Sequence, residues 1–201
     1  MTWDVLNVIG TLAFALSGVV VAMEERYDLM GVYILGFVTA FGGGAIRNLL
    51  IGVPVTALWD QGMLFIIAFV AITILFVFPR FLSRRGSMWG VFFDAIGLAA
   101  FAAQGAIFAN SMGLPVSAAI AAAALTGTGG GMVRDLLAGR RPLFLQKEIY
   151  IAWTLIAGVP IGLGWVSHPI GYFVVVVLIV TLRMLSVRYQ WRLPSRQLGT
   201  S

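Results

Sequence analysis

Residues 39–48 read TAFGGGAIRN, and residues 126–135 read TGTGGGMVRD. Both stretches place three consecutive glycines ahead of an arginine and a polar residue, and both lie within long apolar segments. They are 87 residues apart, and the same offset aligns residues 7–52 with residues 94–139 without a gap. Fifteen of the 46 aligned pairs are identical, and these include glycines and the arginine as well as apolar residues. The sequence therefore predicts an internal duplication.

The composition indicates a protein that lies within a membrane. Of the 201 residues, 60% are hydrophobic and only 10% are charged, whereas about a quarter of the residues of a typical soluble domain are charged. The absence of cysteine and the single histidine, His168, exclude disulfides, thiolate metal sites and histidine-rich metal centres. Because the acidic side chains are scattered and no nucleophile has a nearby base, we expect no enzyme activity, cofactor or resident metal.

Seven segments are long and apolar enough to cross a membrane as helices. Crossing the roughly 30 Å hydrocarbon core takes about 20 mostly apolar residues. We therefore predict an all-α integral membrane protein with seven transmembrane helices, at residues 4–23, 29–51, 61–79, 88–109, 115–138, 149–166 and 169–188.

The distribution of basic residues predicts the orientation of these helices. If the loop that carries Arg84 is cytoplasmic, alternation places every Lys and Arg except Arg47 on the cytoplasmic side. Such an excess of positive charge is typical of cytoplasmic loops, so we expect an outer N-terminus and a cytoplasmic C-terminus. This bias explains the net charge of +5 without a nucleic-acid partner. The basic stretches 80–85 and 140–147 are candidates for contact with anionic lipid headgroups.

The duplication predicts the organisation of the domains. Each copy contains three predicted helices, an odd number, so the second copy begins on the opposite side of the membrane and runs inverted. We expect a first three-helix repeat at residues 1–87, an inverted repeat at 88–167, a seventh helix at 168–188 and a short basic tail at 189–201. Inverted repeats are common in transport proteins, whose sites lie where the repeats meet.

Three adjacent glycines weaken a helix, by roughly 1 kcal/mol each relative to alanine, and two explanations of the paired runs stay open. Glycines allow two helix backbones to pack closely, or they bend a helix so that its free carbonyl groups line an aqueous path. Polar side chains flank both runs, so we favour the bend and expect alanine at Gly43 or Gly130 to leave folding intact. The predicted pore and bend residues are Thr39, Gly42, Gly43, Gly44, Thr126, Thr128, Gly129, Gly130 and Gly131.

Polar residues inside the predicted helices also recur in both halves. Ionisable groups within a membrane are costly, and they normally find a partner or mark a pathway. We expect Asp94 to contact Arg134, whereas Arg47 has the neutral Asn7 in the equivalent place. The candidates for gating or ion pairing are Arg47, Asn48, Asp94, Arg134 and Asp135, and the predicted polar interior residues are Asn7, Ser17 and Gln104.

The doubled glycine–arginine motif, at Gly42–Asn48 and Gly129–Asp135, resembles that of the prokaryotic trimeric intracellular cation (TRIC) channels, which are also catalogued as a glycine-transporter-like family. The resemblance extends over residues 3–190. It implies a homotrimer in a bacterial or archaeal plasma membrane, with a pore in each subunit lined by the second and fifth helices, that conducts monovalent cations and chiefly potassium. Lys147-Glu148 resembles a lipid-linked motif of eukaryotic members, but its place in the repeat differs, so that role is not carried over.

Two functions are compatible with inverted repeats and bent helices. A potassium channel would hold its ions only transiently, and a secondary transporter of glycine or another small neutral amino acid would bind its substrate at the interface of the repeats. We expect the channel, because of the resemblance.

Overall fold

All regular secondary structure is helical in the residues that the structure describes, which are 2–79, 86–145 and 149–191 of a computed structural model. The predicted roles of the basic stretch 80–85 and of Lys147 lie outside these residues. The elements follow in the order α1 (Thr2–Glu24), α2 (Leu29–Ile51), η1 (Val55–Gln61), α3 (Gly62–Val77), α4 (Gly86–Ser111), α5 (Val116–Leu137), η3 (Leu143–Leu145), α6 (Ala152–Gly162) and α7 (Pro169–Arg188).

The predicted fold class is confirmed, with one difference in length. Among the described residues, six helical segments are long and apolar enough to cross a membrane. The sixth predicted span is the exception, because α6 has only 11 residues instead of the 18 expected at 149–166. It ends at Gly162, and Gly164, two residues further on, adopts a left-handed conformation with φ +73°. The Trp165 amide then donates to the Pro160 carbonyl at 2.9 Å, which closes a Schellman cap.

Local sequence also determines where two of the long helices begin. Asp28 precedes α2, and its carboxylate accepts a hydrogen bond from the Gly31 amide at 2.8 Å. His168 precedes α7, where its Nδ1 accepts from the Ile170 amide at 3.3 Å and Pro169 occupies the first helical position. Both side chains satisfy amide groups that the helix itself leaves unpaired. This capping role accounts for the single histidine.

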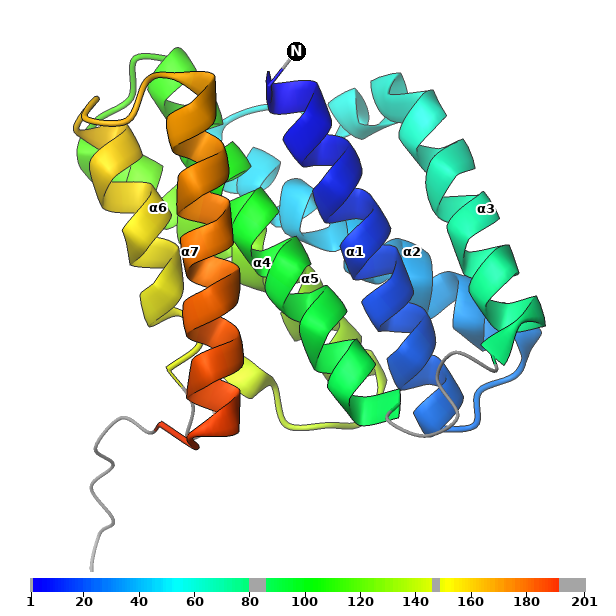
Figure 1. Ribbon diagram of the computed structural model, residues 1–201. Helices are drawn as coiled ribbons and strands as arrows, with labels where there is room; N and C mark the ends of the chain where they lie inside the picture. The colour runs from blue at the N-terminus through cyan, green and yellow to red at the C-terminus, as the bar shows by residue number, and fades with distance from the viewer. Residues whose placement is uncertain (1, 80–85, 146–148, 192–201) are drawn as a thin grey trace, which may run out of the picture.

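Four helices form the centre of the bundle. α1 packs against α2 and α4, and α5 packs against the same two helices. α3 lies against α1 and α2 on one side, while α6 lies against α4 and α5 on the other (Figure 1). α7 packs against α4 and α6. This arrangement is consistent with two three-helix units and an added seventh helix.

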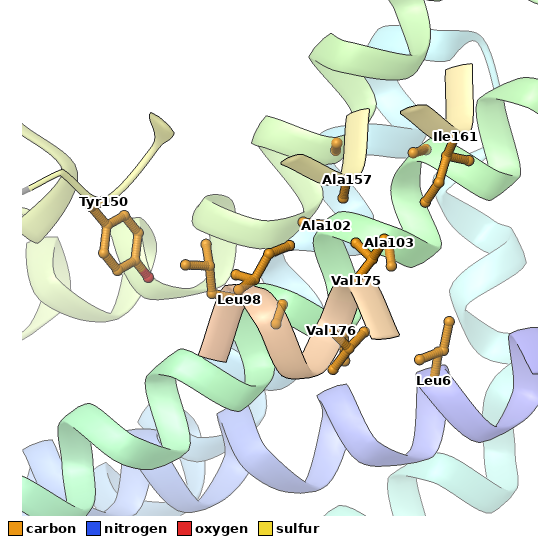
Figure 2. Packing of buried hydrophobic residues seen from close by; sticks show 14 residues of the cluster. Leu6, Leu98, Ala102, Ala103, Tyr150, Ala157, Ile161, Val175 and Val176 are labelled. Carbon is orange, nitrogen blue, oxygen red and sulfur yellow. The ribbon is translucent and has the colours of Figure 1, made fainter. Parts of the chain in front are cut away.

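Small side chains on α4 let its neighbours approach closely. Ala102 and Ala103 are completely buried, and they belong to a cluster that joins α4 to α1, α6 and α7 (Figure 2). The cluster also includes Leu6 of α1, Ile161 of α6 and Val175 of α7. Helices in lipid associate through such close packing rather than through a gain in hydrophobic burial.

Glycine and phenylalanine interlock α1 and α4 in a reciprocal way. A Cβ atom on Gly10 would lie 2.5 Å from the ring of Phe101, and a Cβ atom on Gly97 would collide with the ring of Phe14. The two rings meet edge to face with their centroids 5.3 Å apart, a favourable geometry for an aromatic pair. Positions 10 and 97, like positions 14 and 101, are 87 residues apart.

The central glycines form the crossing of α2 and α5. A Cβ atom on Gly43 would collide with the Thr126 carbonyl oxygen, and one on Gly130 would collide with the Thr39 carbonyl oxygen. α2 and α5 are both continuous α-helix through their glycine runs, so the loss of helical hydrogen bonding expected with a bend is not present. Gly43 and Gly130 therefore serve the close backbone packing that was the alternative explanation.

We now expect Gly43→Ala to destabilise the fold, contrary to the expectation from sequence. The added methyl group meets backbone, which cannot move aside, so the cost should be about 1–3 kcal/mol. Gly42→Ala is the matched control, because its nearest new contact is 3.8 Å away and better helix propensity should leave stability unchanged or raise it by up to about 1 kcal/mol. Thermal unfolding in detergent measures both. Equal stability of the two variants would show that the crossing tolerates the methyl group.

Candidate functional site

A cavity of about 420 Å³ opens at the end of the bundle where α1 and α5 end and α4 begins. We call it the Arg134 cavity. Polar and charged side chains from several segments meet there, and together with apolar neighbours they line it: Ser17, Val21, Glu24, Gly90, Val91, Asp94, Arg134, Asp135, Arg140, Arg141 and Leu143. Arg134 and Asp94 are both only 2% exposed.

Arg134 is neutralised by two carboxylates. Its Nη1 lies 2.8 Å from Asp94 Oδ1, and its Nη2 lies 2.7 Å from Asp135 Oδ1. Nη1 also donates to Ser17 Oγ at 2.6 Å, and Ser17 Oγ in turn donates to the Gly90 carbonyl at 3.2 Å. The predicted Asp94–Arg134 contact is thus present. A buried charge is tolerated when it is paired in this way and its hydrogen bonds are satisfied.

A second, much smaller cavity lies beside Arg47, near the C-terminal end of α2. It has a volume of about 10 Å³, and we call it the Arg47 cavity. It is lined by polar and apolar side chains, which are Asn7, Thr11, Ala40, Phe41, Gly44, Arg47, Leu58, Gln61, Phe101 and Gln104.

Arg47 has only neutral partners among the residues that the structure describes. Asn48 Oδ1 accepts from its Nε at 3.1 Å and from its Nη2 at 2.9 Å, and Gln104 Oε1 accepts from its Nη1 at 3.4 Å. Its guanidinium carbon lies 4.6 Å from the centroid of the Phe108 ring, where the ring face attracts a cation. Asn7 donates to Gln61 instead, at 3.3 Å.

The two arginines occupy matching surroundings of different charge. Each arginine bonds to the residue that follows it and to a side chain from the other half of the chain. The partners Gln104 and Ser17 are themselves 87 residues apart, as are Asn7 and Asp94. In the Arg134 cavity two of the hydrogen-bond partners are carboxylates, whereas both hydrogen-bond partners of Arg47 are amides.

The glycine and threonine residues singled out from the sequence divide into two groups. Gly44 lines the Arg47 cavity, and a Cβ atom on Gly131 would lie 3.3 Å from Asp94 Oδ1, so the last glycine of each run faces a site. The other glycines lie at the helix crossing. The hydroxyls of Thr39, Thr126 and Thr128 each donate to a carbonyl of their own helix.

Two residues of the site were not predicted as site residues. Tyr150 is 2% exposed, and a Cβ atom on Gly131 would lie 3.2 Å from its hydroxyl. Arg183 of α7 is completely buried and stacks on the Tyr150 ring at 4.6 Å. From the sequence, Arg183 served only as one of the basic residues that predict the orientation of the helices in the membrane. Its place within an apolar span nevertheless indicated a buried role.

An exposed ion-pair cluster closes the rim of the Arg134 cavity. Arg140 Nε lies 2.6 Å from Glu25 Oε1, and its Nη2 lies 2.9 Å from Glu24 Oε2. Tyr27 adds a hydrogen bond from its hydroxyl to the Leu137 carbonyl at 2.8 Å. Burial lowers the pKa of Arg140, but the hydrogen bonds with Glu25 and Glu24 outweigh it and raise that pKa above its ordinary value. Arg140 therefore holds the end of α1 against the end of α5.

The described residues contain no group of three or more His, Cys, Asp or Glu side chains that could hold a metal ion. Each cavity contains one buried arginine whose hydrogen-bond partners are carboxylate, amide or hydroxyl groups. Such groups bind and orient small ions or zwitterions, as the site of a transport protein does.

Sequence comparison finds the same doubling. The model of a family described as "Glycine transporter" matches residues 4–80 and again residues 91–167. The UPF0126 membrane protein YvgT of Bacillus subtilis is 58% identical over 196 residues, which cover 98% of this chain and 97% of that protein. The chain belongs to this family.

Solved structures connect the family with the TRIC channels. The crystal structure of a prokaryotic TRIC channel in 0.5 M KCl is 32% identical, with a TM-score of 0.86 and coverage of 95% of this chain and 98% of that one. The TRIC trimeric intracellular cation channel orthologue from Rhodobacter sphaeroides is 29% identical, with a TM-score of 0.84 and coverage of 94% and 98%. The family resemblance inferred from the glycine–arginine motif is confirmed. The chain is an integral membrane protein of the bacterial type.

The Arg134 network should contribute far more to stability than the exposed rim. Asp94→Asn leaves Arg134 buried with one carboxylate, and breaking a buried pair costs about 3–5 kcal/mol, of which Asp135 should recover a part. Glu25→Gln removes an ion pair whose side chains are about a third exposed, so its cost should be below about 1 kcal/mol. Thermal unfolding of both variants in one detergent tests the difference. A rim variant less stable than the buried one would contradict it.

Proposed function

We propose that this protein is a cation channel whose path runs within each subunit between α1, α2, α4 and α5, and that potassium is its main ion. The observation that carries this proposal is the pair of polar cavities on the four central helices, one associated with each glycine run. The similarity of the whole chain to TRIC cation channels supports it.

The Arg134 cavity suits the entrance of a cation path. Arg134 and its two buried carboxylate partners together carry a net negative charge, which attracts a cation to the base of the cavity. At the rim, Arg140 and Arg141 lie beside Glu24. An arginine on a cation path would repel the ion, and the two carboxylates offset this repulsion. Gly44 lines the Arg47 cavity, whereas Gly131 leaves room for the side chains of Asp94 and Tyr150.

The Arg47 cavity is the proposed constriction. Its volume of about 10 Å³ holds at most about one water molecule. A potassium ion would pass only after side chains such as Arg47, Leu58 or Phe101 move. We therefore assign the gate to this half and the vestibule to the Arg134 half.

The proposal extends to the repeats, the assembly and the orientation of the chain. We propose that residues 1–87 and 88–167 are inverted repeats, with residues 168–188 as an added helix, and that three chains assemble as a homotrimer. The repeated family match supports the duplication, and the trimeric description of the Rhodobacter orthologue supports the assembly. In the proposed orientation the N-terminus faces outward and the basic segments are cytoplasmic. We also propose that these basic segments contact anionic lipid headgroups.

Glycine transport is the second candidate, and one observation favours it. The Arg134 cavity presents a guanidinium and carboxylates a few ångströms apart, which complement the carboxylate and ammonium groups of a zwitterion. Its volume of about 420 Å³ would accommodate so small a substrate. The flux experiment below separates the two candidates.

Purified protein in liposomes should pass potassium down its gradient without saturation by glycine. Parallel measurements with sodium and labelled glycine test the selectivity. Because the chain contains no cysteine, Val91→Cys places one thiol in the Arg134 cavity, and its reaction with a charged methanethiosulfonate should reduce potassium flux severalfold.

The control is Gln190→Cys, an exposed position beyond α7, whose modification should leave flux unchanged. Saturable glycine uptake without ionic current would reverse the ranking of the two candidates. Undiminished flux after complete labelling of residue 91 would remove the Arg134 cavity from the path.

The proposed orientation has an equally direct test. Thr56→Cys lies in η1 and Gln190→Cys follows α7, at opposite ends of the bundle. In intact cells an impermeant thiol reagent should label residue 56 and spare residue 190, because only the first would face outward. The reverse pattern would show that the count of basic residues predicts the wrong orientation.

A further inference from the structure

Arg47 carries a buried positive charge that the described part of the chain does not neutralise. Its side chain is 3% exposed, and its hydrogen-bond partners are the amides of Asn48 and Gln104. An arginine inside a membrane protein is costly unless an opposite charge accompanies it. The equivalent Arg134 meets this requirement with Asp94 and Asp135.

A second buried group in the same cavity also lacks a partner. Thr11 lines the Arg47 cavity and is 1% exposed, and its hydroxyl has no hydrogen-bond partner among the residues that the structure describes. Leaving a buried hydroxyl unpaired costs about 1–3 kcal/mol. The residue 87 positions further on is Leu98, so the half that contains Arg134 has no hydroxyl at the position equivalent to Thr11.

The size of the cavity limits what could satisfy both groups. About 10 Å³ is enough for one water-sized particle. The available donors are the guanidinium and the threonine hydroxyl, with the side-chain amides of Asn7 and Gln104 beside them. A cluster of donors around one cationic group favours an anion, and only a monatomic anion fits so small a space.

We propose that the Arg47 cavity binds one halide ion, chloride under ordinary conditions. The ion would supply the negative charge that Asp94 supplies in the other half, and it would accept the Thr11 hydroxyl proton. The site itself does not depend on the proposed channel function. If the path conducts cations, a bound halide would neutralise the constriction, and potassium flux would then rise with chloride at constant potassium.

Bromide is the probe, because it resembles chloride in size and is located by its anomalous scattering. Thermal unfolding of the detergent-solubilised full chain is measured against bromide concentration, with gluconate holding the ionic strength constant. We expect a saturable rise of the midpoint in the wild-type protein, and an anomalous peak beside Arg47 in crystals grown with bromide.

Three variants make the test specific. Asn7→Asp places a carboxylate at the position equivalent to Asp94, and it should abolish the bromide response while raising stability without bromide. Thr11→Val removes one hydrogen bond and should weaken bromide binding about tenfold. Thr181→Val is the matched control, because its hydroxyl is exposed and donates to its own helix at 2.8 Å, and its bromide response should equal that of the wild type.

Several outcomes would overturn the proposal. These are a wild-type midpoint that does not respond to bromide, a response that Asn7→Asp and Thr11→Val both retain in full, and a bromide peak found only at surface arginines. In each case the cavity holds water alone. Potassium flux without any bromide binding would reject the halide site and leave the proposed channel intact, whereas bromide binding without flux would do the opposite.

Discussion

The backbone contact between α2 and α5 is the constraint on which the rest of the structure depends. Gly43 and Gly130 bring the two helices so close that each would strike a carbonyl group of the other if it carried a side chain. This crossing leaves the third glycine of each run, Gly44 and Gly131, facing a polar site rather than a helix. The arginines three residues further along are then directed to the two cavities.

Close packing around glycine and alanine recurs throughout this bundle. α4 presents buried alanines to its neighbours, and the Gly10–Phe101 and Gly97–Phe14 contacts interlock it with α1. Within lipid, the hydrophobic effect offers little to drive helices together, so stability depends on the number of close contacts and on satisfied polar groups. The same contacts also fix the spacing of the helices that surround each arginine.

The two halves use one backbone plan with different electrostatics. Asp94 and Asp135 give the Arg134 site two negative charges, while Asn7 and Asn48 leave the Arg47 site positive. Arg134 lies beside a cavity of about 420 Å³, and Arg47 beside one of about 10 Å³. The proposed path would therefore join a wide half, whose buried arginine has two carboxylate partners, to a narrow half, whose buried arginine has amide partners.

The sequence alone determined the membrane class, six of the seven helices to within a few residues, the family and the Asp94–Arg134 pair. The helices follow from hydropathy, the family from the resemblance of the doubled glycine–arginine motif, and the pair from opposite charges inside predicted helices. Only the tertiary structure decided that the glycine runs are packing contacts in continuous helices, because a backbone collision depends on the neighbouring helix. It also decided that Tyr150 and Arg183 join the Arg134 site, and that Arg47 keeps only neutral partners. The place of Arg183 in an apolar span indicates burial, and Asn7 indicates a neutral surrounding for Arg47. The actual contacts depend on which helices meet at a given depth, and no local pattern in a sequence contains that information.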